Sequence, residues 1–275
     1  SDGDDFVFTD EDGSKLHHEI EYYDNVVGHL VAWVNVTSLS DIKDTEIYLY
    51  YGNESCDSQE DVAGVWDDDY VGVWHKQDNT SVSVRDSTIH HNDGTKKAVG
   101  EPVEGVGQVG LAQVYDDDHV SLGQDQIGPL LDGSTAVTLS AWINGSDLSG
   151  WNTIFYEVVH GDYVCLMFRV QDGRVRIEAR SQNGDVIQSL DSASTLDDDT
   201  WYFVVAVVDY ADGNLSLFVD GVLDNDTGAS WGSSTYVHGT PTFESWMGDH
   251  PTAGRDFSGV IDEVRVSGVA RSAGW

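Results

Sequence analysis

The sequence predicts an all-β protein, an antiparallel β-sandwich preceded by a smaller β-domain. Short segments rich in Val, Ile and aromatic residues recur along the 275-residue chain, and almost no stretch has helical periodicity. Glycine-containing turns such as QDGR, QNGD and ADGN separate these segments. Short strands with turns at regular spacing are typical of sandwiches and jelly rolls.

Seven segments have the composition of strands, and two of them also predict where the strand lies. The segments are 29–36, 46–52, 137–143, 165–170, 174–180, 201–209 and 215–221. RVRIEAR at 174–180 alternates strictly, which predicts one buried side and one solvent-facing side. FVVAVV at 203–208 is apolar on both faces and is expected to be an inner strand. The best boundary lies near WDDDY at 66–70, which divides the chain into domains 1–69 and 70–275.

Several motifs after this boundary occur in a recognisable order. They are GVWHKQD at 72–78, DSTIHHNDGT at 86–95, GLAQVYDDDHVSL at 110–122, and the closing FSGVIDEVRVSGVARSAGW at 257–275. This part of the chain resembles LamG-like, concanavalin A-type jelly rolls, and the closing segment is the most specific match. The turn before Asp117 lacks the usual DG of that family.

The first domain carries a second resemblance. FTDEDGSKL at 8–16 and IYLYYGN at 47–53 are similar to an uncharacterised β-domain that often precedes LamG folds in bacterial and archaeal surface proteins. The usual N-terminal strands of that domain are absent here. The resemblance therefore implies that another chain or upstream sequence completes the sheet, because a missing strand leaves an open edge.

The composition is strongly acidic. The chain has 49 Asp+Glu against 13 Lys+Arg, a net charge of -36, and 40% hydrophobic residues, too many for a disordered acidic tail. Such charge repels itself in dilute buffer, whereas in molar salt the Debye length falls to about 3 Å. We interpret the chain as haloarchaeal or from another extreme halophile, with an ordinary acidic secreted protein as the alternative. The charge argues against nucleic-acid and anionic-membrane partners.

Processing signals favour an extracellular location. No apolar run approaches the roughly 18 residues of a membrane span. The chain begins at SDGDD without a signal peptide, so we expect a mature or excised part of something longer. Six of the ten asparagines begin N-x-S/T motifs, which predicts glycosylation at Asn35, Asn53, Asn79, Asn144, Asn214 and Asn225. The cysteines Cys56 and Cys165 are either two separate thiols or a disulfide.

Asp262 is the main candidate metal ligand. If VIDEVRV at 260–266 is a regular strand, Asp262 shares a face with Val260, Val264 and Val266. A carboxylate on a buried face needs a partner or a cation. The resemblance implies structural Ca²⁺, because the aspartate of this last strand is a frequent calcium ligand in concanavalin A-like jelly rolls. Calcium accepts six to eight flexible oxygen ligands.

Asp117 and Asp118 match the acidic pair of the family's early strand, and they are candidate further ligands through side chain or carbonyl. The alternative is that all three aspartates are solvated, or that Asp262 pairs with an arginine. The triplets Asp67–Asp69 and Asp197–Asp199 are interpreted as halophilic surface.

We expect no enzymatic activity. The same fold occurs in β-glucanases, which place two carboxylates about 5 Å apart on one strand. HEIEYYDN at 18–25 puts Glu19 and Glu21 on one face, but its residue order differs and it lies outside the jelly roll. There is no serine nucleophile elbow, zinc motif or phosphate loop.

Exposed aromatics are the remaining candidates for a binding site, because a sugar stacks on them. Trp151 and Trp231 lie beside Gly and Ser and are the candidate ligand-binding residues; Tyr156, Tyr236 and Trp246 also fall in or beside loop-like segments. The leading hypothesis is an extracellular recognition module for surface glycans or glycoproteins, such as an adhesin or part of a surface filament or viral fibre. The alternatives are a structural subunit of a cell-surface or virion assembly, and a polysaccharide-active enzyme.

Overall fold

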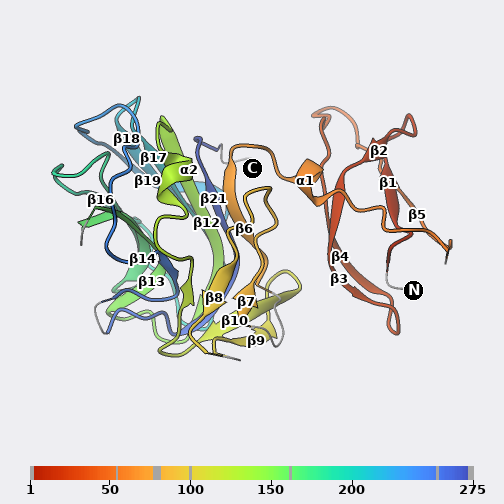
Figure 1. Cartoon of the computed structure of the whole chain (residues 1–275), viewed down its shortest axis with the longest axis horizontal. Coiled ribbons are helices and arrows are strands. Elements are labelled where there is room, and N and C mark those ends of the chain that lie inside the picture. Colours follow the sequence, from red (N-terminus) through yellow and green to blue (C-terminus); the bar gives the residue numbers. More distant parts are fainter. Residues whose placement is uncertain are drawn as a thin grey trace. The chain divides into compact units, whose positions relative to one another are not determined.

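The computed structural model describes residues 3–53, 55–76, 82–98, 101–160, 163–251 and 254–271, without the side chains of 159–165. Apart from the single-turn helices α1 (Val62–Val65) and α2 (Gly128–Leu131), the regular structure is antiparallel β-sheet (Figure 1). The predicted fold class is therefore confirmed. The chain forms two compact units, one up to Asp68 with Ser87–Ile89, the other Asp69–Asp86 with the chain from His90 onward.

The N-terminal unit contains two small sheets. One has the order β2 (Lys15–Leu16), β1 (Val7–Thr9), β5 (Tyr48–Tyr50), and the other pairs β3 (His18–Asp24) with β4 (His29–Val34). Within the described residues β5 pairs only with β1, so its second edge is open. Its side chains are exposed on both faces, with 40% exposure for Leu49 and 55% for Tyr50. Such an edge can accept a further strand.

The C-terminal unit is a sandwich of two sheets. The first sheet has the order β19 (Val222–Gly228), β18 (Asn214–Val219), β17 (Tyr202–Asp209), β12 (Ala136–Gly145), β21 (Gly259–Ser267), β10 (Leu111–Tyr115), β9 (Val103–Val106), and β6 (Tyr70–Trp74) also pairs with β21. Strand β17, which contains FVVAVV, lies between β18 and β12 and is buried from Val204 to Val208. The predicted inner strand is confirmed.

The second sheet carries the candidate site on its outer face. Its order is β16 (Gln188–Asp191), β15 (Arg174–Ala179), β14 (Tyr163–Gln171), β13 (Trp151–His160), β20 (Trp246–Met247), β11 (Val120–Ser121), β8 (Gly94–Lys96), β7 (Ser83–Val84). Strand β15 alternates as predicted: Val175, Ile177 and Ala179 are buried, whereas Arg176 and Glu178 between them are partly exposed.

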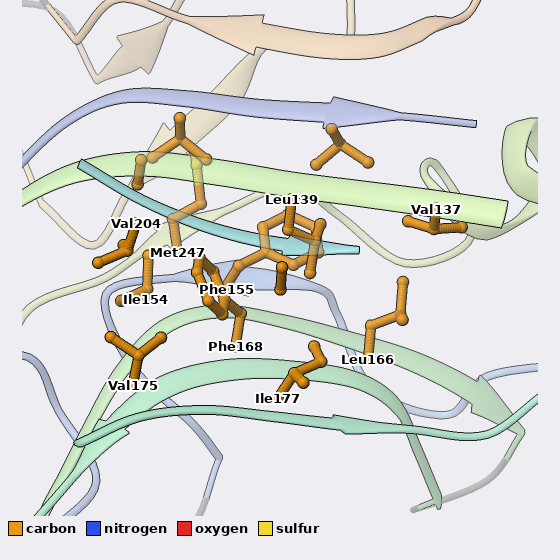
Figure 2. Packing of buried hydrophobic residues seen from close by; sticks show 14 of the residues in the cluster. Val137, Leu139, Ile154, Phe155, Leu166, Phe168, Val175, Ile177, Val204 and Met247 are labelled. Carbon is orange, nitrogen blue, oxygen red and sulfur yellow. The ribbon is translucent and has the colours of Figure 1, made fainter. Parts of the chain in front are cut away.

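One hydrophobic core fills the space between the two sheets. Figure 2 shows Leu139 of β12 and Val204 of β17 facing Phe155, Phe168 and Ile177 of the second sheet. Each fully buried side chain of this size contributes about 1.5–3 kcal/mol relative to exposure. This core packs the inner face of the second sheet against the first and leaves its outer face for the candidate site.

Strand β21 departs from the sequence-based prediction because it contains a β-bulge at Glu263. There its register with β12 shifts by one residue and the backbone φ is 51°. Ile261 lies in the core before the bulge, and Val264 and Val266 lie in it after the bulge. The prediction that Asp262 shares their face is therefore wrong, because the extra residue reverses the alternation.

Candidate functional site

Asp262 closes a hairpin turn. One carboxylate oxygen, Oδ2, accepts backbone N–H groups of Gln108 and Val109, both at 2.9 Å. These residues form the turn between β9 and β10. A Cβ on Gly107 would lie 2.6 Å from the same oxygen, so glycine is needed there. The carboxylate is fully buried and holds the turn against β21.

Asp117 and Asp118 lie in the connection that leads from β10 in the first sheet to β11 in the second. The stretch Val114–Leu122 therefore joins two strands that belong to different sheets. The Lys97 ammonium lies 3.5 Å from Asp117 Oδ2 and 4.0 Å from Asp118 Oδ1. Burial raises the pKa of Asp118.

The three aspartates do not come together. Tyr115 of β10 pairs with Gly259 of β21 at one end of the ladder between these strands. Asp117 lies two residues beyond that end, whereas Asp262 lies three residues from it in the opposite direction, within β21. At about 3.3 Å per residue, the separation along the strands is roughly 15 Å. No carboxylate cluster in the described part of the chain joins Asp262 to Asp117 or Asp118. As a set they do not fit a shared Ca²⁺ site, and calcium binding by this chain stays a prediction.

Trp231 closes one end of the core. Its indole Nε1 donates a 2.8 Å hydrogen bond to the carbonyl of Asp209, and its ring packs edge-to-face on Tyr210 with centroids 5.1 Å apart. Tyr236 is fully buried beside them. Trp231 is thus mainly a packing residue and not the open ring surface that the sequence suggested.

Trp151 is the first residue of β13, and its ring is held by two arginines. The guanidinium carbons of Arg169 and Arg255 lie 3.9 and 4.0 Å from the ring centroid. Two guanidiniums this close cannot share one face without overlapping, so one lies on each side. Neither face is open to a sugar, and Trp151 does not form the predicted stacking surface.

A cross-sheet row of side chains lies on the outer face of the second sheet. Strand register places Glu178, Met167, Tyr156, Trp246 and Ser121 opposite one another in β15, β14, β13, β20 and β11. Directly opposed residues share a face. Tyr156 and Met167 pack in a small cluster of their own, away from the main core. The row therefore faces outward.

A groove of about 530 Å³ opens at one end of this row. His119 lines it and stacks on Trp246, with ring centroids 4.0 Å apart and planes at 10°. Glu244, also in the lining, accepts hydrogen bonds from Ser121 Oγ at 2.7 Å and Trp246 Nε1 at 3.3 Å. Gln126 adds an amide. Burial lowers the pKa of His119, so its imidazole is largely neutral near pH 7.

His250 links the row to Arg255, one of the two arginines that stack on Trp151. His250 meets Tyr156 edge-to-face at 4.5 Å, and Arg255 Nη1 lies 3.3 Å from His250 Nε2. Burial, with the charges of Arg255 and Arg169, lowers the pKa of His250 to about 4. The neutral imidazole accepts the hydrogen bond from Arg255.

Glu178, at the other end of the row, forms ion pairs with Arg169 and Arg176. Arg169 and Arg176 lie 2.9 and 3.0 Å from its carboxylate. Although burial opposes it, these guanidiniums lower the pKa of Glu178.

Glu19 and Glu21 of β3 accept hydrogen bonds inside the N-terminal unit. Glu19 accepts hydrogen bonds from Trp66 Nε1 at 2.8 Å and Ser87 Oγ at 2.6 Å. Glu21 accepts one from Trp33 Nε1 at 2.8 Å. Both carboxylates are buried, and these bonds give each a structural role.

The predicted glycosylation sites differ in their surroundings. Asn53 is exposed, and Asn144 is half-buried in β12. The amide donors of Asn35, Asn214 and Asn225 are already hydrogen-bonded. Asn79 lies outside the described residues, as does the side chain of Cys165; Cys56 is a free thiol.

Sequence reasoning missed His119, Glu244, His250 and Arg255. Their contacts join segments far apart in the chain, which no local pattern encodes.

Comparison with protein families gives two matches. The profile of the concanavalin A-like lectin/glucanases superfamily matches residues 114–275, and that of a domain of unknown function matches 2–96. No curated protein matches the sequence. Within the described residues, no helix has the length and hydropathy needed to cross a membrane.

Solved structures of low sequence identity share the fold. The binding domain of Paraclostridial Mosquitocidal Protein 1 is 11% identical with a TM-score of 0.56 over 75% of this chain and 50% of that one. A structure of botulinum neurotoxin type C, a toxin whose cell entry depends on interaction with two ganglioside molecules, is 12% identical. Its TM-score is 0.52 over 75% of this chain and 49% of the toxin chain. Domain 4 of AbnA, an extracellular arabinanase of Geobacillus stearothermophilus solved with arabinotriose, is 17% identical (TM-score 0.51; 72% and 91%). This chain spans about half the length of the toxin chains.

Proposed function

The chain belongs to the concanavalin A-like lectin/glucanases superfamily, and from this premise we propose that it is an extracellular module that recognises surface glycans or glycoproteins. The observation that carries the proposal is the groove beside the stacked rings of His119 and Trp246.

The groove has the chemistry that a sugar requires. The apolar C–H face of a pyranose packs on an aromatic ring, while carboxylate and amide groups bind its hydroxyls. His119, which stacks on Trp246, supplies the ring that lines the groove, and Glu244 and Gln126 supply the polar groups. The volume lies within the range of about 300–1,000 Å³ that is usual for ligand sites. Arabinotriose and gangliosides in the structural relatives support a glycan ligand.

Charge and glycosylation motifs support the proposed setting, the surface of a halophilic cell or of a virion. Recognition there serves adhesion, as part of a surface protein, filament or viral fibre. We propose binding rather than hydrolysis, because the sequence's one glucanase-like stretch uses Glu19 and Glu21 for internal hydrogen bonds.

The test is saturable binding of the purified chain to isolated haloarchaeal surface glycans in 2 M NaCl. We expect Trp246→Ala and His119→Ala each to weaken binding at least tenfold, because each removes half of the stack. The matched control is Trp142→Ala, which removes a half-buried tryptophan from β12 of the first sheet. Circular dichroism checks the fold of each variant. Absence of saturable binding, or equal losses in Trp246→Ala and Trp142→Ala, contradicts the proposal.

The open edge of β5 favours a second candidate, a structural subunit that assembles with other copies of this chain. Leu49 and Tyr50 are exposed on opposite faces of an edge that has no partner strand among the described residues, as expected for a strand that accepts a neighbour. Sedimentation in 2 M NaCl tests it: self-association that Tyr50→Lys weakens supports assembly, whereas a monomer at all concentrations contradicts it.

A further inference from the structure

Arginines are concentrated on the outer face of the second sheet. The whole chain has 13 Lys+Arg, and Arg169, Arg176 and Arg255 meet around Trp151 and Glu178. Two of them are neutralised: Arg169 by Glu178 at 2.9 Å, and Arg176 by Glu178 at 3.0 Å and by Asp191 at 2.6 Å.

Arg255 differs from the other two. Among the described residues no carboxylate lies within 4.0 Å of its guanidinium nitrogens, although the chain contains 49 acidic residues. Its neighbours Asp249 and Asp256 are also outside that distance. In the part of the chain that the structure describes, this cation thus has no carboxylate partner, although acidic groups are in large excess.

The structure nevertheless holds Arg255 in a fixed position. Its guanidinium stacks on Trp151, one nitrogen hydrogen-bonds to His250, and its carbonyl accepts the N–H of Thr153 at 3.1 Å. The side chain remains partly exposed. Stacking uses the face of the guanidinium and leaves the in-plane N–H donors available, of which His250 takes one. A planar fork of this kind matches a carboxylate or sulfate with two parallel hydrogen bonds.

We propose that Arg255 is an anion subsite of the glycan-binding face, and that the ligand is an acidic glycan carrying carboxylate or sulfate groups. The proposal rests on the glycan recognition proposed above and specifies its substrate class. The subsite is connected to the groove: Trp246 is paired with Tyr156, Tyr156 contacts His250, and His250 contacts Arg255. Tyr156 and His250 are themselves buried, so these contacts do not form the binding surface but place Arg255 on the same face of the second sheet as the groove.

The protein's net charge of -36 determines the conditions of the test. At low ionic strength the field of the whole molecule repels any polyanion. In 2 M NaCl the Debye length is only about 2 Å, so long-range repulsion and non-specific ion exchange are both suppressed. Preference for an acidic sugar under these conditions reports short-range hydrogen bonding.

Calorimetry in 2 M NaCl compares two pairs of polymers, polygalacturonate with its methyl ester and dextran sulfate with dextran. We expect the wild-type chain to bind at least one acidic member tenfold or more tightly than its neutral counterpart; the pair that shows the preference identifies carboxylate or sulfate as the group bound. Arg255→Gln should remove that preference, so that the acidic and the neutral polymer of the pair bind equally. Arg176→Gln is the matched control, since it removes the same charge from the same face at a guanidinium already bonded to two carboxylates.

Equal binding of acidic and neutral polymers by the wild type, including binding of none, overturns the anion subsite. A preference that survives Arg255→Gln, or that Arg176→Gln removes equally, also overturns it. These results remain distinct from failure of glycan recognition itself. If binding to isolated surface glycans still depends on Trp246, the groove functions and only the subsite is wrong; if that binding is absent as well, both proposals fail.

Discussion

A buried acid in β13 illustrates how single residues depend on their surroundings. The side chain of Glu157 is 1% exposed, and burial raises its pKa to about 8, with a smaller opposing effect from the Ser245 hydroxyl hydrogen bond. Gly128, at the start of α2, lies so close that a Cβ there would be 2.9 Å from Glu157 Oε1. At neutral pH the native state therefore holds this carboxyl mostly protonated.

The raised pKa makes stability depend on pH in a defined direction. Between the ordinary pKa of 4.5 and about 8, the native state keeps the proton while the unfolded chain loses it. The free energy of unfolding should therefore fall as pH rises through this window, by up to about 1.4 kcal/mol per pH unit. We expect Glu157→Gln to flatten this slope, and urea unfolding at pH 5, 6, 7 and 8 in 2 M NaCl measures it.

Other groups titrate in the same window, so the difference between the two proteins is the informative quantity. The pKa of His250 is lowered, which gives a slope of opposite sign. His250 is present in both wild type and variant, so its contribution largely cancels. Parallel curves for wild type and Glu157→Gln would show that Glu157 does not titrate as described.

At the scale of elements, the β9–β10 hairpin depends on β21 through Asp262. Asp262→Ala removes the acceptor from the N–H groups of Gln108 and Val109 and should lower the free energy of unfolding by about 2–4 kcal/mol. Asp262→Asn keeps a carbonyl acceptor and should cost about 1 kcal/mol. Urea unfolding of the three proteins in 2 M NaCl measures both effects.

Chelation separates this role from calcium binding. If Asp262 only closes the turn, EDTA leaves the Tm of the wild type unchanged. If Asp262 binds calcium, EDTA lowers the Tm of the wild type and has little further effect on Asp262→Asn. The second result would contradict the assignment of this carboxylate to the turn alone.

Sequence patterns predicted regular strands well and irregular positions poorly. FVVAVV and RVRIEAR were placed correctly because burial on both faces gives a continuous apolar run, whereas burial on one face gives an alternating pattern. The bulge at Glu263 was not predictable, because a positive φ at a non-glycine residue leaves no mark in composition. The stack of His119 on Trp246 was not predictable either, because these two residues come together only when β11 pairs with β20. The local spacing of apolar residues therefore predicts the strands, whereas the candidate site depends on pairing between strands that are distant in the sequence.

At the scale of the whole molecule, charge dominates. With 49 Asp+Glu and 13 Lys+Arg, repulsion between carboxylates favours the unfolded chain wherever salt does not screen it. The ion pairs of the second sheet involve few of these acids. We therefore expect stability to rise steeply with ionic strength, so that Tm increases as NaCl goes from 0.05 to 1 M.

The shape of that increase identifies its cause. Screening has most of its effect by about 1 M, where the Debye length has fallen to about 3 Å, and then levels off. Exclusion of salt from the protein surface instead gives a rise that continues linearly above 1 M and that sucrose reproduces. Differential scanning calorimetry in NaCl and in sucrose distinguishes the two. A Tm that changes little below 1 M would mean that the acidic surface does not destabilise the fold, and the halophilic interpretation would lose its physical basis.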